Sequence, residues 1–349
     1  MAYSCVPKES KKQIIKAGEI LISDTTTPED YQKAYDLATQ WRACHAYPIN
    51  TFQSLLRNKL GKGNYGGEPI VAQRLKRMPT IIDKLKRYPT MNLVTMQDIG
   101  GVRAVLDSIV DVYKLRDEYL KCRFAHELID QKDYILAPRS DDGYRSVHHI
   151  YKYKNVQNPN YDGLRLELQI RTKRQHLWAT AVETMGTFLG QALKSRQGSQ
   201  DWLDFFALIS SAFAYAENTP PIPRFLDLSK ADTSQQIAII NRNLGAVQKM
   251  QSLSVAVKYL SQKKGHSYHL IILDSKEKTV SVKSYSGNSL EIALQDYAGY
   301  EKSASEGRLI EPVLVSAGKI DMVRKAYPSF FLDISEFLRI VQKIITKKR

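Results

Sequence analysis

A chain of 349 residues is long enough for about two domains, and its 43% hydrophobic and 25% charged residues are typical of a globular protein. The apolar runs are too short to span a bilayer, the N-terminus lacks the apolar segment of a secretory signal, and three isolated cysteines exclude a disulfide framework or a thiolate zinc site of the usual spacing. We therefore expect a cytoplasmic protein with no membrane partner, and the net charge of +15 predicts an anionic partner such as a nucleotide or RNA.

The first 67 residues are predicted to be mostly helical. Helices are expected over residues 8–21, 27–46 and 50–60. The second of these begins with Thr27 as N-cap and Pro28 at the first helical position. The glycine-rich loop at 61–67 is not followed by the Gly-Lys-Ser/Thr of a P-loop, so it is predicted to be a connector.

A strongly basic segment follows. Nine lysine and arginine residues stand against two acids between Arg57 and Arg87. Basic surfaces often serve only solubility, but this imbalance is too large for an ordinary solvated face and favours anion binding. One helix is predicted to begin at Glu68 and Pro69 and to carry Arg74, Lys76, Thr80, Lys84 and Arg87.

The middle of the chain alternates strands with turns and one helix. Strands or extended segments are predicted over residues 98–106, 123–136, 145–154 and 164–170, with a helix over 111–119. In the last strand, apolar and polar residues alternate, so Arg165, Glu167, Gln169 and Arg171 share one face. That face belongs either to an edge strand protected by charge or to a polar site.

Two helices and a proline-rich segment complete the first part of the chain. The helices are expected over residues 173–194 and from an N-cap at Ser199, and the aromatic residues of the second are predicted to be core. The prolines of residues 219–223 predict a linker between a domain at 1–218 and a domain at 224–349. Beyond the linker, helices are expected over 233–262, 289–305, 320–327 and 333–346, and strands over 267–274, 279–285 and 311–316. The predicted fold class is α+β, a mixed β-sheet flanked by helices plus a smaller C-terminal α+β domain.

Two acids stand out by their context. Asp98 precedes the glycine pair that opens a strand, and Glu167 lies between cationic neighbours. Magnesium prefers oxygen ligands and commonly takes one or two carboxylates together with substrate phosphates, so the pair suits a metal-bound triphosphate. Scattered surface acids are the commoner explanation of any single aspartate.

Four blocks of this sequence resemble the RelA/SpoT synthetase domain. They are residues 74–87, the Asp-Ile-Gly-Gly-Val-Arg of residues 98–103, residues 132–135 with the Gly-Tyr-Arg-Ser-Val-His of 143–148, and the Glu-Leu-Gln-Ile-Arg-Thr of 167–172 followed by His-Leu-Trp-Ala at 176–179. The blocks fall in the order of that family with near-family spacing and span about residues 40–195.

The resemblance implies a nucleotidyltransferase-like fold that transfers pyrophosphate from ATP to the 3′-hydroxyl of GDP or GTP and releases AMP. It implies that Asp98 and Glu167 hold Mg²⁺, that Glu167 helps to deprotonate the acceptor, and that Arg74 and Arg103 sandwich the adenine. Lys76, Thr80, Lys84 and Arg87 would bind the ATP phosphates. Acceptor binding would fall to Lys132, Arg139, Tyr144, Arg145, His148, Gln169 and Arg171. His149 points to the opposite face of its strand from His148, so we expect only one of them in the site.

Alternatives to this function stay open. The loop before Tyr144 is one residue longer than in many alarmone synthetases and carries Asp141 and Asp142, which would repel acceptor phosphates. Toxins similar to this family place pyrophosphate on the 3′-end of tRNA, and the net charge suits RNA. A catalytically inactive RNA- or protein-binding module is a third hypothesis.

Regulation and assembly are also predicted. The chain has no His-Asp hydrolase motif, so a synthetase without hydrolase activity is expected. Residues 224–349 are hypothesised to regulate it as a fused inhibitor or sensor. A homo-oligomer and an inhibitory protein partner also stay open.

Overall fold

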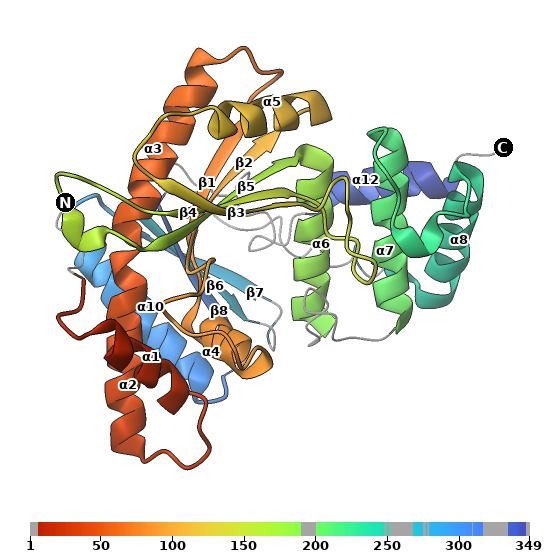
Figure 1. Cartoon of the computed structure of the whole chain (residues 1–349). Helices are drawn as coiled ribbons and strands as arrows, with labels where there is room; N and C mark the ends of the chain where they lie inside the picture. Colours follow the sequence, from red (N-terminus) through yellow and green to blue (C-terminus); the bar gives the residue numbers. More distant parts are fainter. Residues whose placement is uncertain are drawn as a thin grey trace.

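The computed structural model describes residues 6–189, 200–247, 250, 268–274, 277, 279–308, 310–316 and 334–346. These residues form a five-stranded mixed sheet and a three-stranded antiparallel sheet, both accompanied by helices (Figure 1). The predicted α+β class with a mixed sheet is therefore confirmed. None of the described helices is both long and apolar enough to cross a membrane.

The large sheet has the strand order β1-β2-β5-β4-β3, in which only β2 and β5 are parallel. Its strands are β1 (Ile70–Leu75), β2 (Gly100–Leu106), β3 (Glu127–Asp133), β4 (Val147–Lys152) and β5 (Arg165–Thr172). The charged strand β5 lies at the centre, between β2 and β4. This position is inconsistent with the edge-strand interpretation, because β5 has a neighbouring strand on both sides. The polar face of β5 therefore lies in the middle of the sheet.

Three helices precede the sheet, namely α1 (Lys11–Ile20), α2 (Pro28–Cys44) and α3 (Ala46–Lys62). The side chain of Ser10 caps α1, and that of Thr27 caps α2 as predicted. Helix α3 begins earlier than expected, with Pro48 inside its first turn. Proline is tolerated there because the first N–H groups of a helix have no partner within the helix.

The helix predicted from Glu68 was wrong in its first half. Residues Ile70–Leu75 form β1, paired antiparallel to β2, and α4 (Met78–Arg87) begins only after it. The β-branched Ile70 and Val71 favour a strand, and Pro79 fits at the start of a helix but not in its interior. Arg74 therefore lies on the sheet, and Thr80, Lys84 and Arg87 lie on the helix.

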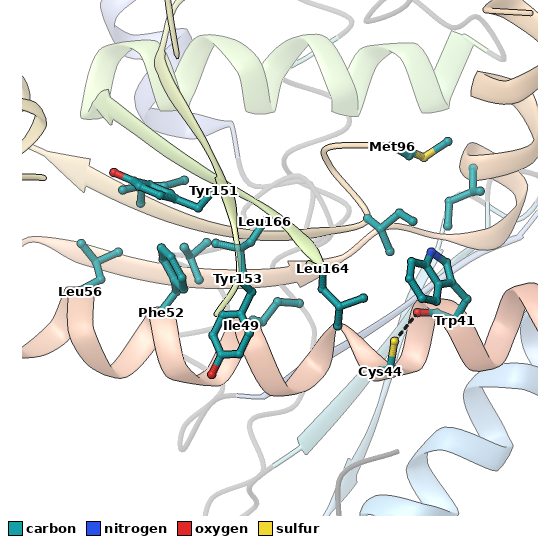
Figure 2. Packing of buried hydrophobic residues seen from close by; sticks show 14 of the residues in the cluster. Trp41, Cys44, Ile49, Phe52, Leu56, Met96, Tyr151, Tyr153, Leu164 and Leu166 are labelled. Carbon is teal, nitrogen blue, oxygen red and sulfur yellow. Dashed lines mark hydrogen bonds between the residues drawn. The ribbon is translucent and has the colours of Figure 1, made fainter. Parts of the chain in front are cut away.

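A hydrophobic core joins α3 to one face of the large sheet. Figure 2 shows this packing, in which Ile49, Phe52 and Leu56 of α3 lie against Tyr151, Tyr153, Leu164 and Leu166 at the sheet. The ring centroids of Phe52 and Tyr151 are 5.3 Å apart. On β5 the residues of this face are Leu166, Leu168 and Ile170, which are all buried, as is Leu164 just before the strand. The alternating polar residues consequently point to the opposite face.

A second core lies where α6 (Lys173–Leu189) and α7 (Gln200–Ala216) meet α8 (Lys230–Leu244) and α12 (Ser335–Thr346). It includes the predicted core aromatics Trp202, Phe205 and Phe206, and the ring of Phe337 in α12 lies 6.2 Å from that of Phe206 at a tilt of 34°. Residues on both sides of the predicted linker thus share one core, and the division at 219–223 stays a prediction. The expected helix over 173–194 is confirmed to residue 189, and its last residues and Ser199 lie outside the described residues. The helix predicted over 320–327 also lies outside the described residues, as do residues 251–262 of the helix predicted over 233–262.

The small sheet has the order β7-β6-β8 and is entirely antiparallel. It consists of β6 (Tyr268–Asp274), β7 (Thr279–Tyr285) and β8 (Ile310–Ser316), with α10 (Leu290–Ser305) packed on it. Figure 1 shows α10 beside α4 and the N-terminal helices. The C-terminal strands and α10 agree with the prediction, and their location brings residues near 300 to the start of α4.

Candidate active site

Strand register brings six of the predicted site residues onto the polar face of the large sheet. Paired residues of neighbouring strands project their side chains to the same face. One row is Arg74, Gly101 and Glu167, on β1, β2 and β5. The next row consists of Ala72, Arg103, Gln169, His148 and Lys132, which spans all five strands.

Hydrogen bonds connect four side chains of this face and Tyr144, which precedes β4, into one network. Arg103 donates from Nε to Oε1 of Gln169 at 3.2 Å, and Gln169 donates from Nε2 to Oε2 of Glu167 at 2.8 Å. The other carboxylate oxygen of Glu167 lies 2.8 Å from Nδ1 of His148. Nε2 of His148 lies 2.9 Å from the hydroxyl of Tyr144. The network thus runs from a predicted ATP-binding residue to a predicted acceptor-binding residue, with Glu167 in its middle.

The charges of this network are set by burial and by its neighbours. Burial alone would lower the pKa of His148, but Tyr144 and Glu167 outweigh it and raise the pKa to about 9. Burial alone would raise the pKa of Glu167, but the hydrogen-bonded His148 outweighs it and holds the pKa below its usual value. At neutral pH the pair is therefore an imidazolium and a carboxylate.

Asp98 lies just before β2 and is held by two lysines. Nζ of Lys76 is 2.9 Å from Oδ2 of Asp98, and Nζ of Lys84 is 2.8 Å from Oδ1. Burial alone would raise the pKa of Asp98, but these two ammonium groups outweigh it and hold the pKa well below its usual range. The negative charge of Asp98 also acts to raise the pKa of Glu167, so the two acids lie within electrostatic reach of each other.

Arg74 and Arg103 occupy diagonal positions on adjacent strands. Arg74 is paired with Gly101, and Arg103 is paired with Ala72, which is two residues before Arg74 on β1. Diagonal neighbours of this kind are about 7–8 Å apart. A flat ring that contacts a planar group on each face needs roughly 7 Å between those groups, from contacts of about 3.5 Å on each side. The register therefore suits the predicted arginine sandwich around a purine.

The remaining ATP-binding candidates lie on α4. Met78, Ile81 and Leu85 are buried, and Thr80 and Lys84 are one turn apart on a different stripe of the helix. Arg87 at the end of α4 pairs with Asp83 through Nη2 at 2.8 Å and Nε at 2.9 Å. Thr80, Lys84 and Arg87 thus form a line along α4, with the lysine bound to Asp98 in its middle.

The loop before Tyr144 neutralises one of the two acids predicted to repel an acceptor. Nη2 of Arg139 lies 3.1 Å from Oδ2 of Asp142, and Oδ1 of Asp142 accepts a hydrogen bond of 2.9 Å from the backbone N–H of Tyr144. The guanidinium of Arg139 also lies over the ring of Tyr144, 4.8 Å from its centroid. A planar cation therefore lies over the ring of Tyr144, a predicted acceptor-binding residue, while Asp141 is exposed.

A small pocket adjoins this loop. Its lining consists of Arg139, Asp142, Tyr144, Trp178, Val182, Leu203 and Phe206. The last four come from α6 and α7 and were not among the predicted site residues. Their spacing, four residues apart on α6 and three on α7, is the only sequence signal for them, and it is the same signal that marks any buried helix face.

Three other acceptor candidates are placed differently from one another. Lys132 lies on the polar face beside His148 and pairs with Asp130 at 3.2 Å. Arg171 is buried, and its Nη2 is hydrogen-bonded to Nδ1 of His176. Arg145 donates from Nε to Oγ of Ser210 in α7, at 3.0 Å, and from Nη1 to the carbonyl of Ile135. The contacts of Arg145 are thus with α7 and a loop, away from the two acids.

The histidines divide as predicted. His148 joins the polar network, whereas His149 lies on the other face and contacts the hydroxyl of Tyr151 from Nδ1 at 3.3 Å. His176 and Trp178 are buried, and Nε1 of Trp178 donates to the carbonyl of Phe206 at 2.7 Å. Trp178 is therefore a packing residue, and it also lines the pocket beside Tyr144.

Asp98 and Glu167 are the residues that could hold a metal ion. Both are ionised and close enough to interact, and carboxylate oxygen is a ligand that Mg²⁺ prefers. In the part of the chain that the structure describes, no group of three or more His, Cys, Asp or Glu residues could hold a metal. Two carboxylates fit a Mg²⁺ ion that takes its other ligands from substrate phosphates and water.

Comparison with known proteins finds relatives of the part of the chain that carries these residues. The family model described as "Region found in RelA / SpoT proteins" matches residues 73–186. The GTP pyrophosphokinase YjbM of Bacillus subtilis is 35% identical over 117 residues, which are 33% of this chain and 54% of that protein. The GTP pyrophosphokinase YwaC of the same organism is 31% identical over 123 residues, 33% of this chain and 58% of that protein. Small alarmone synthetase 2 of Bacillus subtilis has a TM-score of 0.42 at 23% identity over 54% of this chain and 95% of its own.

The match is confined to one part of the chain. This chain spans between half and three fifths of the length of these two curated relatives. Both acids, the two arginines of the sheet, the lysines of α4 and the tyrosine of the loop all lie inside the matched range. Residues 73–186 of this chain are therefore similar to a region found in RelA/SpoT proteins.

Proposed function

We propose that this chain is a synthetase that transfers the β,γ-pyrophosphate of ATP to the 3′-hydroxyl of GDP or GTP, giving AMP and an alarmone of the (p)ppGpp type. The observation that carries the proposal is that two ionised acids with different surroundings lie within electrostatic reach of each other. Asp98 lies between two lysines, and Glu167 lies between a histidine and a glutamine. A site for a polyphosphate thus adjoins a site for a hydroxyl acceptor.

The lysines and arginines would bind and orient ATP. Lys76 and Lys84 would exchange part of their contact with Asp98 for contact with the phosphates, because an ammonium group has three donors. Arg74 and Arg103 would hold the adenine between their guanidinium planes. Positioning and neutralisation of charge supply most of the catalysis in phosphoryl-type transfers.

Glu167 would accept the proton of the acceptor hydroxyl. The 3′-oxygen attacks the β-phosphorus of ATP, a bond forms between them, and the bond from the β-phosphorus to the oxygen that bridges to the α-phosphate breaks. AMP leaves with that oxygen, and the hydroxyl proton goes to the carboxylate of Glu167. The imidazolium of His148 keeps Glu167 ionised and fixes one of its oxygens at 2.8 Å, so the carboxylate is ready to accept a proton.

Asp98 and Glu167 would hold Mg²⁺ when ATP is bound. The ion would neutralise charge on the phosphate oxygens and orient them for the transfer. Because both carboxylates are ionised well below neutral pH, no proton has to leave them before a cation binds.

Asp142 bears on the choice of acceptor. Its carboxylate is paired with Arg139 and turned toward the backbone of Tyr144, so its repulsion of acceptor phosphates is reduced. This pairing favours GDP or GTP. The net charge of +15 favours the 3′-end of tRNA as the second candidate acceptor, because lysine and arginine contacts with phosphates provide most non-specific RNA affinity.

An acceptor assay tests the proposal. The full chain is incubated with Mg²⁺ and ATP labelled at the γ-phosphate, with GDP, GTP or deacylated tRNA offered separately. We expect labelled guanine nucleotide and AMP in equal amounts. Label on tRNA would replace the nucleotide acceptor by RNA, ADP in place of AMP would contradict pyrophosphate transfer, and no label on any acceptor would favour an inactive binding module.

A further inference from the structure

A carboxylate from the C-terminal part of the chain is buried at the start of α4. Glu301, near the end of α10, accepts a hydrogen bond of 3.1 Å at Oε1 from the backbone N–H of Met78, the first residue of α4. The side chain of Glu301 is only 3% exposed. The contact joins the helix that carries Thr80 and Lys84 to a residue 223 positions further along the chain.

Helix α4 lacks a cap of its own. Its N-cap residue, Arg77, makes no side-chain capping hydrogen bond, and Pro79 in its first turn has no N–H to offer. A helix start normally receives an acceptor from a nearby Ser, Thr, Asp or Asn, and it favours a negative charge because of its dipole. Glu301 supplies both from α10, so the C-terminal part provides the cap that the sequence around residue 77 lacks.

Arg42 extends this contact to the site. Its Nη1 lies 3.6 Å from Oε2 of Glu301, and its Nη2 donates to the hydroxyl of Tyr297, which donates in turn to Oε1 of Glu301 at 2.7 Å. Its Nε donates to the backbone carbonyl of Lys76 at 2.6 Å. Lys76 is the residue whose ammonium group binds Asp98. Three buried side chains thus hold the backbone on both sides of residue 77.

We infer that Glu301 is a positioning residue for ATP, acting through Arg42 and the start of α4. The inference rests on the proposed function, because it takes Lys76 and α4 to bind the phosphates. Removal of Glu301 leaves the guanidinium of Arg42 buried without its counter-charge and leaves the Met78 N–H without its acceptor, which loosens the backbone that carries both lysines. The C-terminal part therefore supports ATP binding, whereas a fused inhibitor would oppose it.

The test uses the full chain with Glu301→Ala, the conservative variant Glu301→Gln, and Tyr297→Phe. Glu291→Gln is the matched control, because Glu291 lies on the same helix and is exposed. Three quantities are measured: hydrogen exchange of the amides of α4 without ligand, the Kd of the non-hydrolysable analogue α,β-methylene-ATP, and the KM of the acceptor in the transfer assay. Exchange and analogue binding do not depend on turnover.

Glu301→Ala is expected to speed exchange in α4 about tenfold relative to β2 and β5 and to weaken binding of the analogue about tenfold, by loss of a helix cap and of a buried counter-charge. The acceptor KM should stay unchanged. Glu301→Gln, which keeps an oxygen acceptor for Met78, should recover part of the loss, and Glu291→Gln should match the original chain.

Unchanged exchange in α4, or exchange that rises equally in the sheet, would overturn the inference. Tighter binding of the analogue after removal of Glu301 would also overturn it, in favour of inhibition. If Glu301→Ala does not fold, Tyr297→Phe and Glu301→Gln give the same two readouts. If the original chain binds the analogue but transfers no pyrophosphate, the proposed function fails, and a loss of binding in the variants still supports the role of Glu301.

Discussion

His148 and Glu167 form an ion pair across neighbouring strands, with Nδ1 of the imidazole 2.8 Å from a carboxylate oxygen. They are diagonal neighbours, because His148 is paired in register with Gln169 and Glu167 with Ile150. Both side chains are largely buried, at 11% and 13% exposure, so each depends on the other for its charge. The pair therefore links the protonation of an acceptor-side residue to that of the predicted base.

The first prediction is that this pair makes the stability of the protein fall with rising pH. The pKa of His148 is raised from 6.5 to about 9 in the folded state, so its contribution is complete below pH 6.5 and is lost as the pH rises through 9. Between pH 6.5 and 8 the loss is about 2 kcal/mol, at roughly 1.4 kcal/mol for each pH unit. The pKa of Tyr144, lowered to about 8, adds an opposite dependence only above that window.

Thermal unfolding at a series of pH values checks this dependence. His148→Gln keeps a side chain that can donate to Glu167 but does not titrate, so its curve should be flatter than that of the original chain between pH 6.5 and 8. Parallel curves over this range would show that His148 does not carry the charge assigned to it.

The second prediction concerns Glu167 itself. Glu167→Gln should lower the rate of transfer by about 10²–10⁴, the usual contribution of a general base. Affinity for ATP should fall less, because Asp98 and the two lysines that contact it remain. The measurements are kcat in the acceptor assay and the Kd of an ATP analogue. Glu127→Gln on β3, an exposed acid, is the control and should keep full activity. Turnover that survives in Glu167→Gln would remove this residue from the chemistry.

The alternation along β5 carried most of what sequence could predict about the site. It predicted that Glu167 and Gln169 share a face, and the register then adds Arg103 and His148 to that face. Both acids follow from such local patterns, because a strand has a period of two and a glycine pair marks its entry. The error at residues 68–77 arose because a basic run of mixed composition has no clear period, and pairing with β2 decides its structure.

Contacts between distant parts of the chain were beyond the reach of sequence patterns. No local signal relates Glu301 to Met78, and nothing near residue 178 indicates that an apolar helix face borders the loop of Tyr144. Such contacts depend on how the elements pack, whereas periodicity only reports which face of each element is buried. The same limit explains why Arg145 was predicted beside the acceptor and lies against Ser210.

The third prediction separates two lysines of α4. Lys84 contacts Asp98 at 2.8 Å, whereas Lys86, two residues further, is exposed. Lys84→Gln should raise the KM for ATP on the order of tenfold to a hundredfold, the range for a lost hydrogen bond between charged groups. It should also raise the pKa of Asp98, since Lys84 is one of the two cations that lower it. Lys86→Gln has the same change of charge and should alter the KM less than threefold at moderate salt, where exposed charges are screened. Equal effects of both substitutions on the KM would indicate that ATP responds only to the net positive charge of α4 and makes no specific contact with Lys84.

The fourth prediction concerns the glycine that precedes Tyr144. Gly143 has a φ of +74°, and an added Cβ would lie 2.6 Å from Cδ1 of Ile222 and 2.8 Å from Cβ of Ser210. Gly143→Ala therefore combines backbone strain with a clash against α7, and it should cost about 2–4 kcal/mol of stability. It should also raise the KM of the acceptor, because the loop that orients Tyr144 must shift. Gly245→Ala is the matched control, since Gly245 has a φ of +60° with open space around its Cβ position, and only the strain of about 1 kcal/mol applies. Thermal unfolding and acceptor kinetics measure both effects, and equal losses in the two variants would show that the packing of Gly143 against α7 contributes nothing.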